Sequence, residues 1–90
     1  MELKKAIGLA IKRARKRTGL SQEAFSMVSS RTYLSTLERG LKNPTVEKVH
    51  EIAVAMGVHP LSILFDSYLL HDDSLSANDL FSRIRGELDL

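Results

Sequence analysis

The side chains of this sequence that could perform acid–base, nucleophilic or metal chemistry are few and scattered. The three histidines, His50, His59 and His71, show no metal-ligand spacing, and Asp72 and Asp73 lie in an acidic stretch typical of a solvated surface. The absence of cysteine excludes thiolate metal sites and cysteine nucleophiles. No phosphate-cradling glycine loop or nucleophile-elbow motif is present. We therefore expect neither an enzyme nor a metal or other cofactor.

The distribution of charge is more informative than these groups. Residues 1–65 carry 11 Lys and Arg against five Asp and Glu, whereas residues 66–90 carry two against six. Five of the cations fall within six residues and are Lys12, Arg13, Arg15, Lys16 and Arg17. A basic body followed by an acidic tail predicts an anionic partner for the first part of the chain. The cluster taken alone also fits a solvated helix face.

Length and composition indicate one small soluble domain, because the chain has 90 residues, 43% of them hydrophobic and 27% charged. No uncharged apolar run approaches the roughly 18 residues of a membrane span. The N-terminal stretch has lysines among its apolar residues and no small-residue cleavage pattern, unlike a secretory signal. We expect a cytoplasmic protein without a membrane partner.

Apolar spacing and the positions of glycine and proline predict helices and no strand, so the expected fold class is all-α. The expected helices cover residues 3–17, 22–28, 31–39, 46–56, 60–65 and 77–88. Ser21, Ser30, Thr45, His59 and Ser76 directly precede five of them and are expected to cap them. Residues 1–66 are expected to form a domain of five helices, and residues 67–90 an acidic C-terminal extension with an extra helix.

Two short helices separated by a tight break, over residues 22–39, are typical of a helix-turn-helix. The sequences LSQE, SRTYLS, LERG, NPT and IA begin at residues 20, 30, 37, 43 and 52. With these in order over roughly residues 7–65, the sequence resembles the XRE (Cro/repressor-type) helix-turn-helix regulators. This resemblance implies a lambda-repressor-like domain that binds double-stranded DNA as a homodimer at a palindromic operator and regulates transcription.

The resemblance also implies roles for individual residues. Those expected to read base edges are Arg31, Thr32, Ser35 and Thr36, and arginine can bond both N7 and O6 of guanine. Those expected to contact phosphates are Gln22, Arg15, Arg39, Lys42 and Asn43. Glu38 matches a structural position that pairs with a basic group. The segment from Phe25 to Ser30 is about two residues shorter than in the family and lacks a turn glycine, and the register of the recognition helix depends on it.

The apolar residues of the last two helices have three possible uses: packing on their own domain, forming a dimer, or binding another protein. The residues expected at a dimer interface are Leu61, Leu64, Phe65, Leu80, Phe81 and Ile84. The sequence therefore predicts a sequence-specific dimeric transcriptional regulator, similar to a prophage repressor or a restriction–modification controller. The alternative is an antitoxin that binds a toxin through its tail and represses its own operon.

Overall fold

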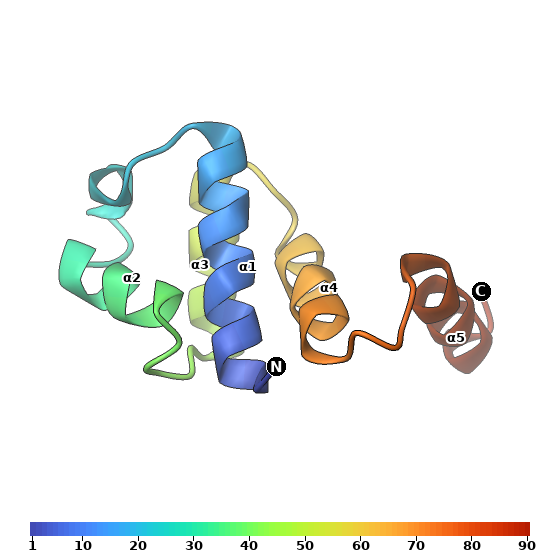
Figure 1. Cartoon of the computed structure of the whole chain (residues 1–90). Coiled ribbons are helices and arrows are strands. Elements are labelled where there is room, and N and C mark those ends of the chain that lie inside the picture. Colours follow the sequence, from blue (N-terminus) through green and yellow to red (C-terminus); the bar gives the residue numbers. More distant parts are fainter.

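The computed structural model describes all of residues 1–90, and it contains helices and no strands (Figure 1). Five α-helices and one short 3-10 helix follow in the order α1 (Leu3–Thr18), η1 (Gln22–Phe25), α2 (Arg31–Glu38), α3 (Val46–Met56), α4 (Pro60–His71) and α5 (Ala77–Leu88). The predicted all-α class is confirmed. Most helix starts also agree with the sequence prediction, because local capping groups determine them.

Polar side chains cap four of the helices as expected, but Ser21, expected to cap the second helix, makes no side-chain capping bond. The hydroxyls of Ser30, Thr45 and Ser76 each accept a hydrogen bond at 3.0 Å from the backbone N–H three residues further on. His59 caps α4 through its ring Nδ1, which accepts from the N–H of Leu61 at 3.0 Å. These bonds satisfy backbone donors that have no partner inside the helix.

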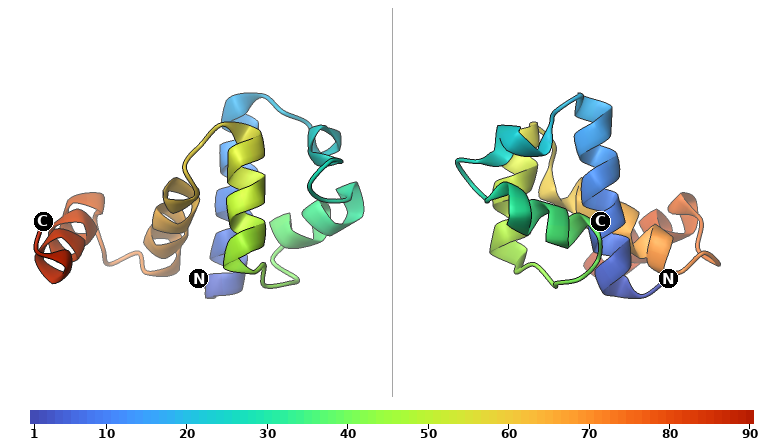
Figure 2. Two further views of the ribbon diagram at one scale, coloured as in Figure 1. Left: turned by 180° about the vertical axis from the view of Figure 1, so that it is seen from behind. Right: turned by 60° about the vertical axis from the view of Figure 1, so that its left-hand side comes forward.

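α1 is the central helix, with α2 on one side, α4 on the other and α3 behind (Figures 1 and 2). The alanines on its buried face are short, which allows neighbouring helices to approach closely. The core cluster takes side chains from α1, η1, α2, α3 and α4, and its members are Ala10, Ile11, Ala14, Phe25, Leu34, Leu37, Val49, Ile52, Ala53, Met56 and Ile63. No residue of α5 belongs to it.

The second helix differs from the prediction. It is a 3-10 helix that ends at Phe25, whereas an α-helix to Val28 was expected. Phe25 is buried in the core, and only the segment 26–30 separates it from the start of α2, so the chain must turn at once. The Nζ of Lys48 on α3 donates to the carbonyl oxygen of Val28 at 2.7 Å and holds this turn. The unusual shortness of the segment is thus absorbed in the second helix.

The fifth helix also differs, because α4 continues to His71 although an end at Phe65 was expected. The boundary expected after residue 66 therefore falls within this helix. No glycine or proline interrupts residues 66–71. Ser67 is completely buried, and its hydroxyl donates to the carbonyl oxygen of Ile63 at 2.7 Å, which satisfies this polar group inside the packing between α4 and the body.

Gly57, with φ 73°, ends α3, and Pro60 opens α4, so the chain turns sharply between the two helices.

No single helix of the chain is both long and apolar enough to cross a membrane. Only α3 and α4 taken together reach that length and composition, and they are bent by 113° relative to each other.

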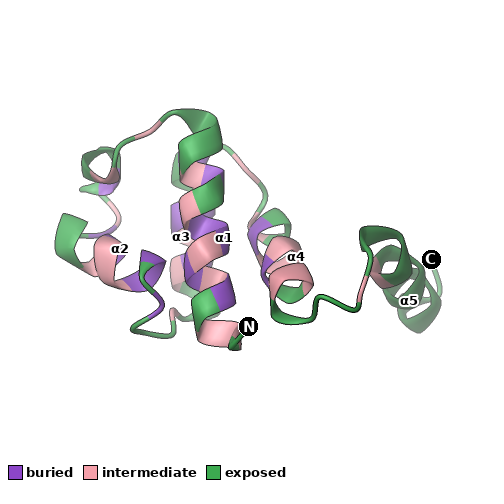
Figure 3. Cartoon of the chain, in the orientation of Figure 1, coloured by how far each residue is buried: buried purple, intermediate pink, exposed green.

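α5 stands apart from the rest of the molecule, beyond α4 (Figures 1 and 2). None of its residues is buried, and most of its surface is exposed (Figure 3). Its contact with the body includes the stacked rings of Phe65 on α4 and Phe81 on α5, whose centroids are 4.4 Å apart. The body thus completes its core without this helix.

Candidate nucleic-acid interface

The inner face of α2 is held against α1 by close backbone packing. Leu34 and Leu37 are fully buried. Gly8 on α1 lies directly against the end of α2, because a Cβ atom there would come within 2.1 Å of the carbonyl oxygen of Leu37. Gly40, with φ +73°, lies so close to Lys5 that a side chain would meet it at 2.7 Å. These two close contacts therefore fix the distance between α1 and the C-terminal end of α2.

A buried ion pair also holds the C-terminal end of α2. The guanidinium of Arg15 on α1 donates to both carboxylate oxygens of Glu38, from Nε at 2.6 Å and from Nη2 at 2.8 Å. Its Nη1 donates to the carbonyl oxygen of Leu20 at 3.0 Å. The hydrogen bonds from Arg15 to Glu38, with their charge attraction, raise the pKa of Arg15 above its ordinary value. The pairing expected for Glu38 is present.

This ion pair corrects the expectation that Arg15 contacts a phosphate. Only 11% of its side chain is exposed, and the guanidinium points to Glu38 and Leu20. A buried carboxylate needs such a partner, because an unpaired charge in a low-dielectric interior is costly. Arg15 is therefore a structural residue in this fold.

Gln22 links η1 to α2 through the same carboxylate. Its Nε2 donates to Oε1 of Glu38 at 3.0 Å. The side-chain amide has two N–H groups, so one is left for another acceptor such as a phosphate oxygen. Gln22 is half-buried, which leaves that amide at the edge of the surface formed by α2.

The outer face of α2 and the start of η1 border an open polar hollow of about 390 Å³. It is lined by Gln22, Arg31, Thr32, Ser35 and Arg39, with no hydrophobic residue among them. All five were expected to contact DNA, and the structure brings them together on one surface. Thr32, Arg31 and Arg39 are exposed.

The remaining expected DNA contacts lie outside this hollow. Thr36 is half-buried, and its hydroxyl donates to the carbonyl oxygen of Thr32 at 2.8 Å. Lys42 and Asn43 are exposed in the loop that follows α2. The Nζ of Lys42 lies 5.7 Å from the ring centroid of Tyr33, in a cation–π arrangement.

Two polar contacts of this region were not predicted. Glu23 on η1 pairs with Arg31 on α2, with 2.9 Å between Oε1 and Nη1. Lys48 on α3 pairs with Glu51 at 2.9 Å in addition to holding the carbonyl of Val28. The pair of Glu23 and Arg31 joins two elements across a turn, where no helical period connects the residues, so sequence spacing carried no signal for it.

The histidines have local roles in the structure. His50 is exposed on α3, His59 caps α4, and the Nδ1 of His71 lies 2.7 Å from the carbonyl oxygen of Met1. No group of three His, Asp or Glu side chains could hold a metal ion.

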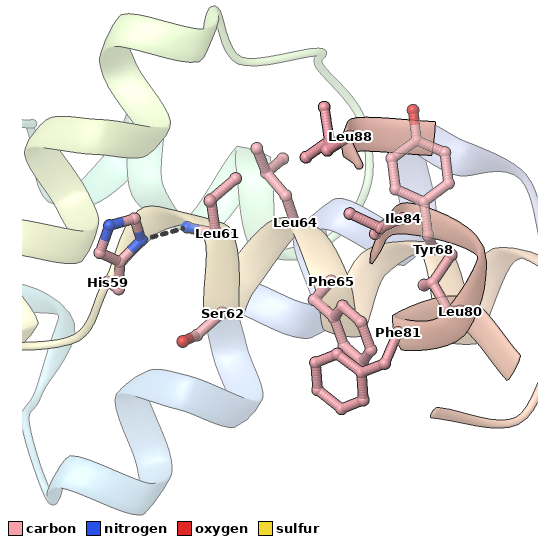
Figure 4. A pocket seen from close by; sticks show the side chains of 10 residues that line it. All are labelled: His59, Leu61, Ser62, Leu64, Phe65, Tyr68, Leu80, Phe81, Ile84 and Leu88. Atoms are coloured by element: carbon pink, nitrogen blue, oxygen red, sulfur yellow. Dashed lines mark hydrogen bonds between the residues drawn. The ribbon is translucent and has the colours of Figure 1, made fainter. Parts of the chain in front are cut away.

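A second surface, which we call the α4–α5 groove, is apolar and lies between these two helices (Figure 4). It has a volume of about 930 Å³ and is lined by His59, Leu61, Ser62, Leu64, Phe65, Tyr68, Leu80, Phe81, Ile84 and Leu88. All six residues expected at a dimer interface are among them. Leu61, Phe81 and Leu88 are more than half exposed, at 63%, 54% and 62%.

η1, the tight turn after it and α2 with its polar outer face together form a helix-turn-helix. This arrangement defines a class of DNA-binding proteins. The family described as Helix-turn-helix (HTH_3) matches residues 11–63. The chain belongs to this XRE-type family of transcriptional regulators, which confirms the predicted resemblance. The family consists of regulators and not of enzymes, as expected from the sequence.

Individual proteins agree with this assignment. The HTH-type transcriptional regulator y4dJ of Sinorhizobium fredii is 41% identical over 66 residues, which cover 71% of this chain and 86% of that protein. The control protein C.BamHI of Bacillus amyloliquefaciens is 38% identical over 50 residues, or 53% of this chain and 62% of that protein. The crystal structure of the clp gene regulator ClgR from Corynebacterium glutamicum matches with a TM-score of 0.76 and 25% identity, and the match covers 97% of this chain and 95% of that one. The fold is thus lambda-repressor-like, as predicted.

Proposed function

We propose that the protein reads a specific DNA sequence with the outer face of α2 placed in the major groove. The observation that supports this most is the polar hollow, which unites side chains from η1 and α2 on one surface. Arg31 and Thr32 lie in the first turn of α2, where base edges are nearest in this type of docking. Ser35 lies one turn further on, and its short side chain allows the helix to approach closely. Thr36 offers a methyl group to thymine.

The residues at the end of α2 and beyond it supply contacts to phosphates in this proposal. They are Arg39, Lys42 and Asn43, with Gln22 as a neutral donor from η1. Arg15 is excluded because Glu38 holds it. Two exposed cations per protomer, and so four per dimer, predict a salt dependence with a log–log slope of about −4.

The proposed regulator acts as a homodimer that joins through the α4–α5 groove. The groove exposes apolar side chains on both of its walls, and such surfaces mark interaction sites. A two-fold arrangement would place the same apolar residues of two copies against each other, so each copy would cover the surface of the other. Two recognition helices would then meet two half-sites of a palindromic operator.

Among regulators, we favour a controller similar to those of restriction–modification systems over a prophage repressor. The similarity to the control protein C.BamHI supports this choice. A reporter gene placed behind the promoter of the protein's own gene would show whether the protein controls that promoter. Immunity to a co-resident phage would instead support the prophage repressor.

The base-reading role is tested by selecting binding sites from random double-stranded DNA with the wild type and with Arg31→Ala. The variant should lose about 1–3 kcal/mol on the wild-type site and its preference at one symmetric base pair. Arg83→Ala on α5 is the matched control, because it removes an exposed arginine far from α2. An unchanged motif from Arg31→Ala would show that another residue reads this base.

The phosphate role is tested by measuring affinity against salt concentration. Lys42→Ala should weaken binding to selected and random DNA by the same factor, because a phosphate contact carries no sequence information. The slope should become shallower by about one unit per lost contact. A loss confined to the selected site would place Lys42 at a base.

The dimer is tested by sedimentation equilibrium of the purified protein at micromolar concentration. The proposal requires a concentration-dependent dimer. A monomer that becomes a stable complex only with a second, different protein from its native host would favour the antitoxin alternative, in which the α4–α5 groove binds a toxin.

A further inference from the structure

The ion pair between Glu23 and Arg31 lies at the rim of the proposed reading surface. Nη1 of Arg31 is 2.9 Å from Oε1 of Glu23, and both side chains are mostly exposed, at 68% and 71%. The pair spans the turn, because Glu23 belongs to η1 and Arg31 is the first residue of α2. The contact with Glu23 therefore orients this guanidinium toward η1, although a side chain exposed to this extent has room for many other rotamers.

The pair leaves Arg31 able to bind a base. A guanidinium has five N–H groups, and the contact with Glu23 uses one of them. Guanine presents two acceptors, N7 and O6, in the major groove, and two parallel N–H groups can meet both. Arg31 can thus bond a guanine while Glu23 retains its contact on the other side.

A phosphate is a different acceptor for the same arginine. It carries a full negative charge, and its attraction to arginine supplies the part of DNA binding that ignores sequence. The carboxylate of Glu23 compensates the charge of the guanidinium and repels a phosphate placed beside it. The acceptors of guanine carry no net charge, so the same carboxylate penalises them much less.

We propose that Glu23 is a positioning residue that keeps Arg31 available for a base and disfavours its contact with phosphates. This inference rests on the proposed base-reading role of Arg31. Glu23 increases the ratio of specific to random binding, and it does so through Arg31.

The experiment compares wild type and Glu23→Gln on the selected operator and on random duplex DNA over a range of salt concentrations. An exposed ion pair contributes little to stability, so the variant should fold normally, which circular dichroism verifies. Affinity for random DNA should rise about three- to tenfold, and the ratio of specific to random affinity should fall by a similar factor. The salt slope on random DNA should steepen by about one unit per protomer.

Glu47→Gln is the matched control, because Glu47 is an exposed carboxylate in the first turn of α3 and has no ion pair. It should change both affinities by one common factor and leave their ratio unaltered. If Glu23→Gln also leaves this ratio unaltered, Glu23 acts only by general repulsion of DNA, and the proposal is overturned.

The double variant Glu23→Gln/Arg31→Ala tests whether the effect of Glu23 on specificity depends on Arg31. If Glu23 acts through Arg31, its substitution in the Arg31→Ala background should leave the ratio of specific to random affinity unchanged. A ratio that still falls there would overturn the proposal while the role of Arg31 stands. If Arg31→Ala alone selects the wild-type motif, the proposed base reading itself has failed.

Discussion

α2 and α5 are both short amphipathic helices that begin with a serine cap, yet they relate to the molecule in opposite ways. α2 buries Leu34, Leu37 and Glu38 against the body, and α5 buries no residue. The exposed face of α2 is polar, whereas α5 exposes an apolar stripe that includes Phe81, Ile84 and Leu88. The comparison shows that the helix with the polar outer face is anchored in the core, and that the helix with the apolar stripe lacks such an anchor in the single chain.

This difference has an energetic consequence for the isolated chain. α2 can unfold only by exposing core leucines, so its stability should equal that of the whole body. α5 makes its contact with the body near one aromatic pair, and a helix of 12 residues is marginal in water by itself. We expect α5 to open locally at a much lower free energy than α2.

The largest effect should come from removing the ion pair that supports α2. Glu38→Ala leaves the guanidinium of Arg15 without its partner, with only 11% of that side chain exposed. The free energy of unfolding should fall by about 3 kcal/mol, as measured by urea denaturation. Glu47→Ala, on an exposed carboxylate, should change it by less than about 0.5 kcal/mol. Similar values for both variants would mean that the support of α2 does not depend on this pair.

A smaller effect, confined to association, is expected for the apolar side. Phe81→Ala removes the α5 ring from the α4–α5 groove and should raise the dissociation constant of the proposed dimer about 30-fold, or about 2 kcal/mol. Unfolding of the monomer, followed at high dilution, should be unchanged. Leu90→Ala, at a residue outside the groove that is 80% exposed, is the control. Unaltered dimerisation in Phe81→Ala would place the interface elsewhere.

The smallest effects compare the two caps directly. Ser30→Ala should lower the global free energy of unfolding by about 1 kcal/mol, because α2 unfolds with the core. Ser76→Ala should reduce the helicity of α5 and leave the global midpoint of the monomer unchanged. Amide hydrogen exchange across both helices measures the two effects in one sample. Equal losses of global stability would show that α5 unfolds together with the body.

The features predicted correctly from the sequence are those determined by neighbouring residues. The caps at Ser30, Thr45, His59 and Ser76 are bonds over two or three residues, so the local sequence contains both partners. The end of the first helix, expected at residue 17 and found at Thr18, is likewise a local property, because Gly19 follows it with φ 76°. The outward residues of α2 followed from the inward position of its leucines together with the family resemblance.

The features that were missed depend on contacts between distant segments. Arg15 belongs to a basic cluster in the sequence, and only the fold shows that Glu38, 23 residues away, accepts from it. The ion pair of Glu23 with Arg31 requires the geometry of the short turn. The end of α4 was placed too early because the resemblance ended there, although no residue between 66 and 71 stops a helix.

The division of α2 into an anchored and a free face has a consequence for evolution and engineering. Substitutions at Thr32 or Ser35 touch neither the core nor the ion pair of Glu38, so they should alter the operator preference at little cost to folding. New specificities could therefore arise by single steps, each through a stable protein, with Leu34, Leu37 and Gly8 held constant. A library of variants at these two positions, sorted for binding to chosen operators, would retarget this protein while its scaffold stays the same.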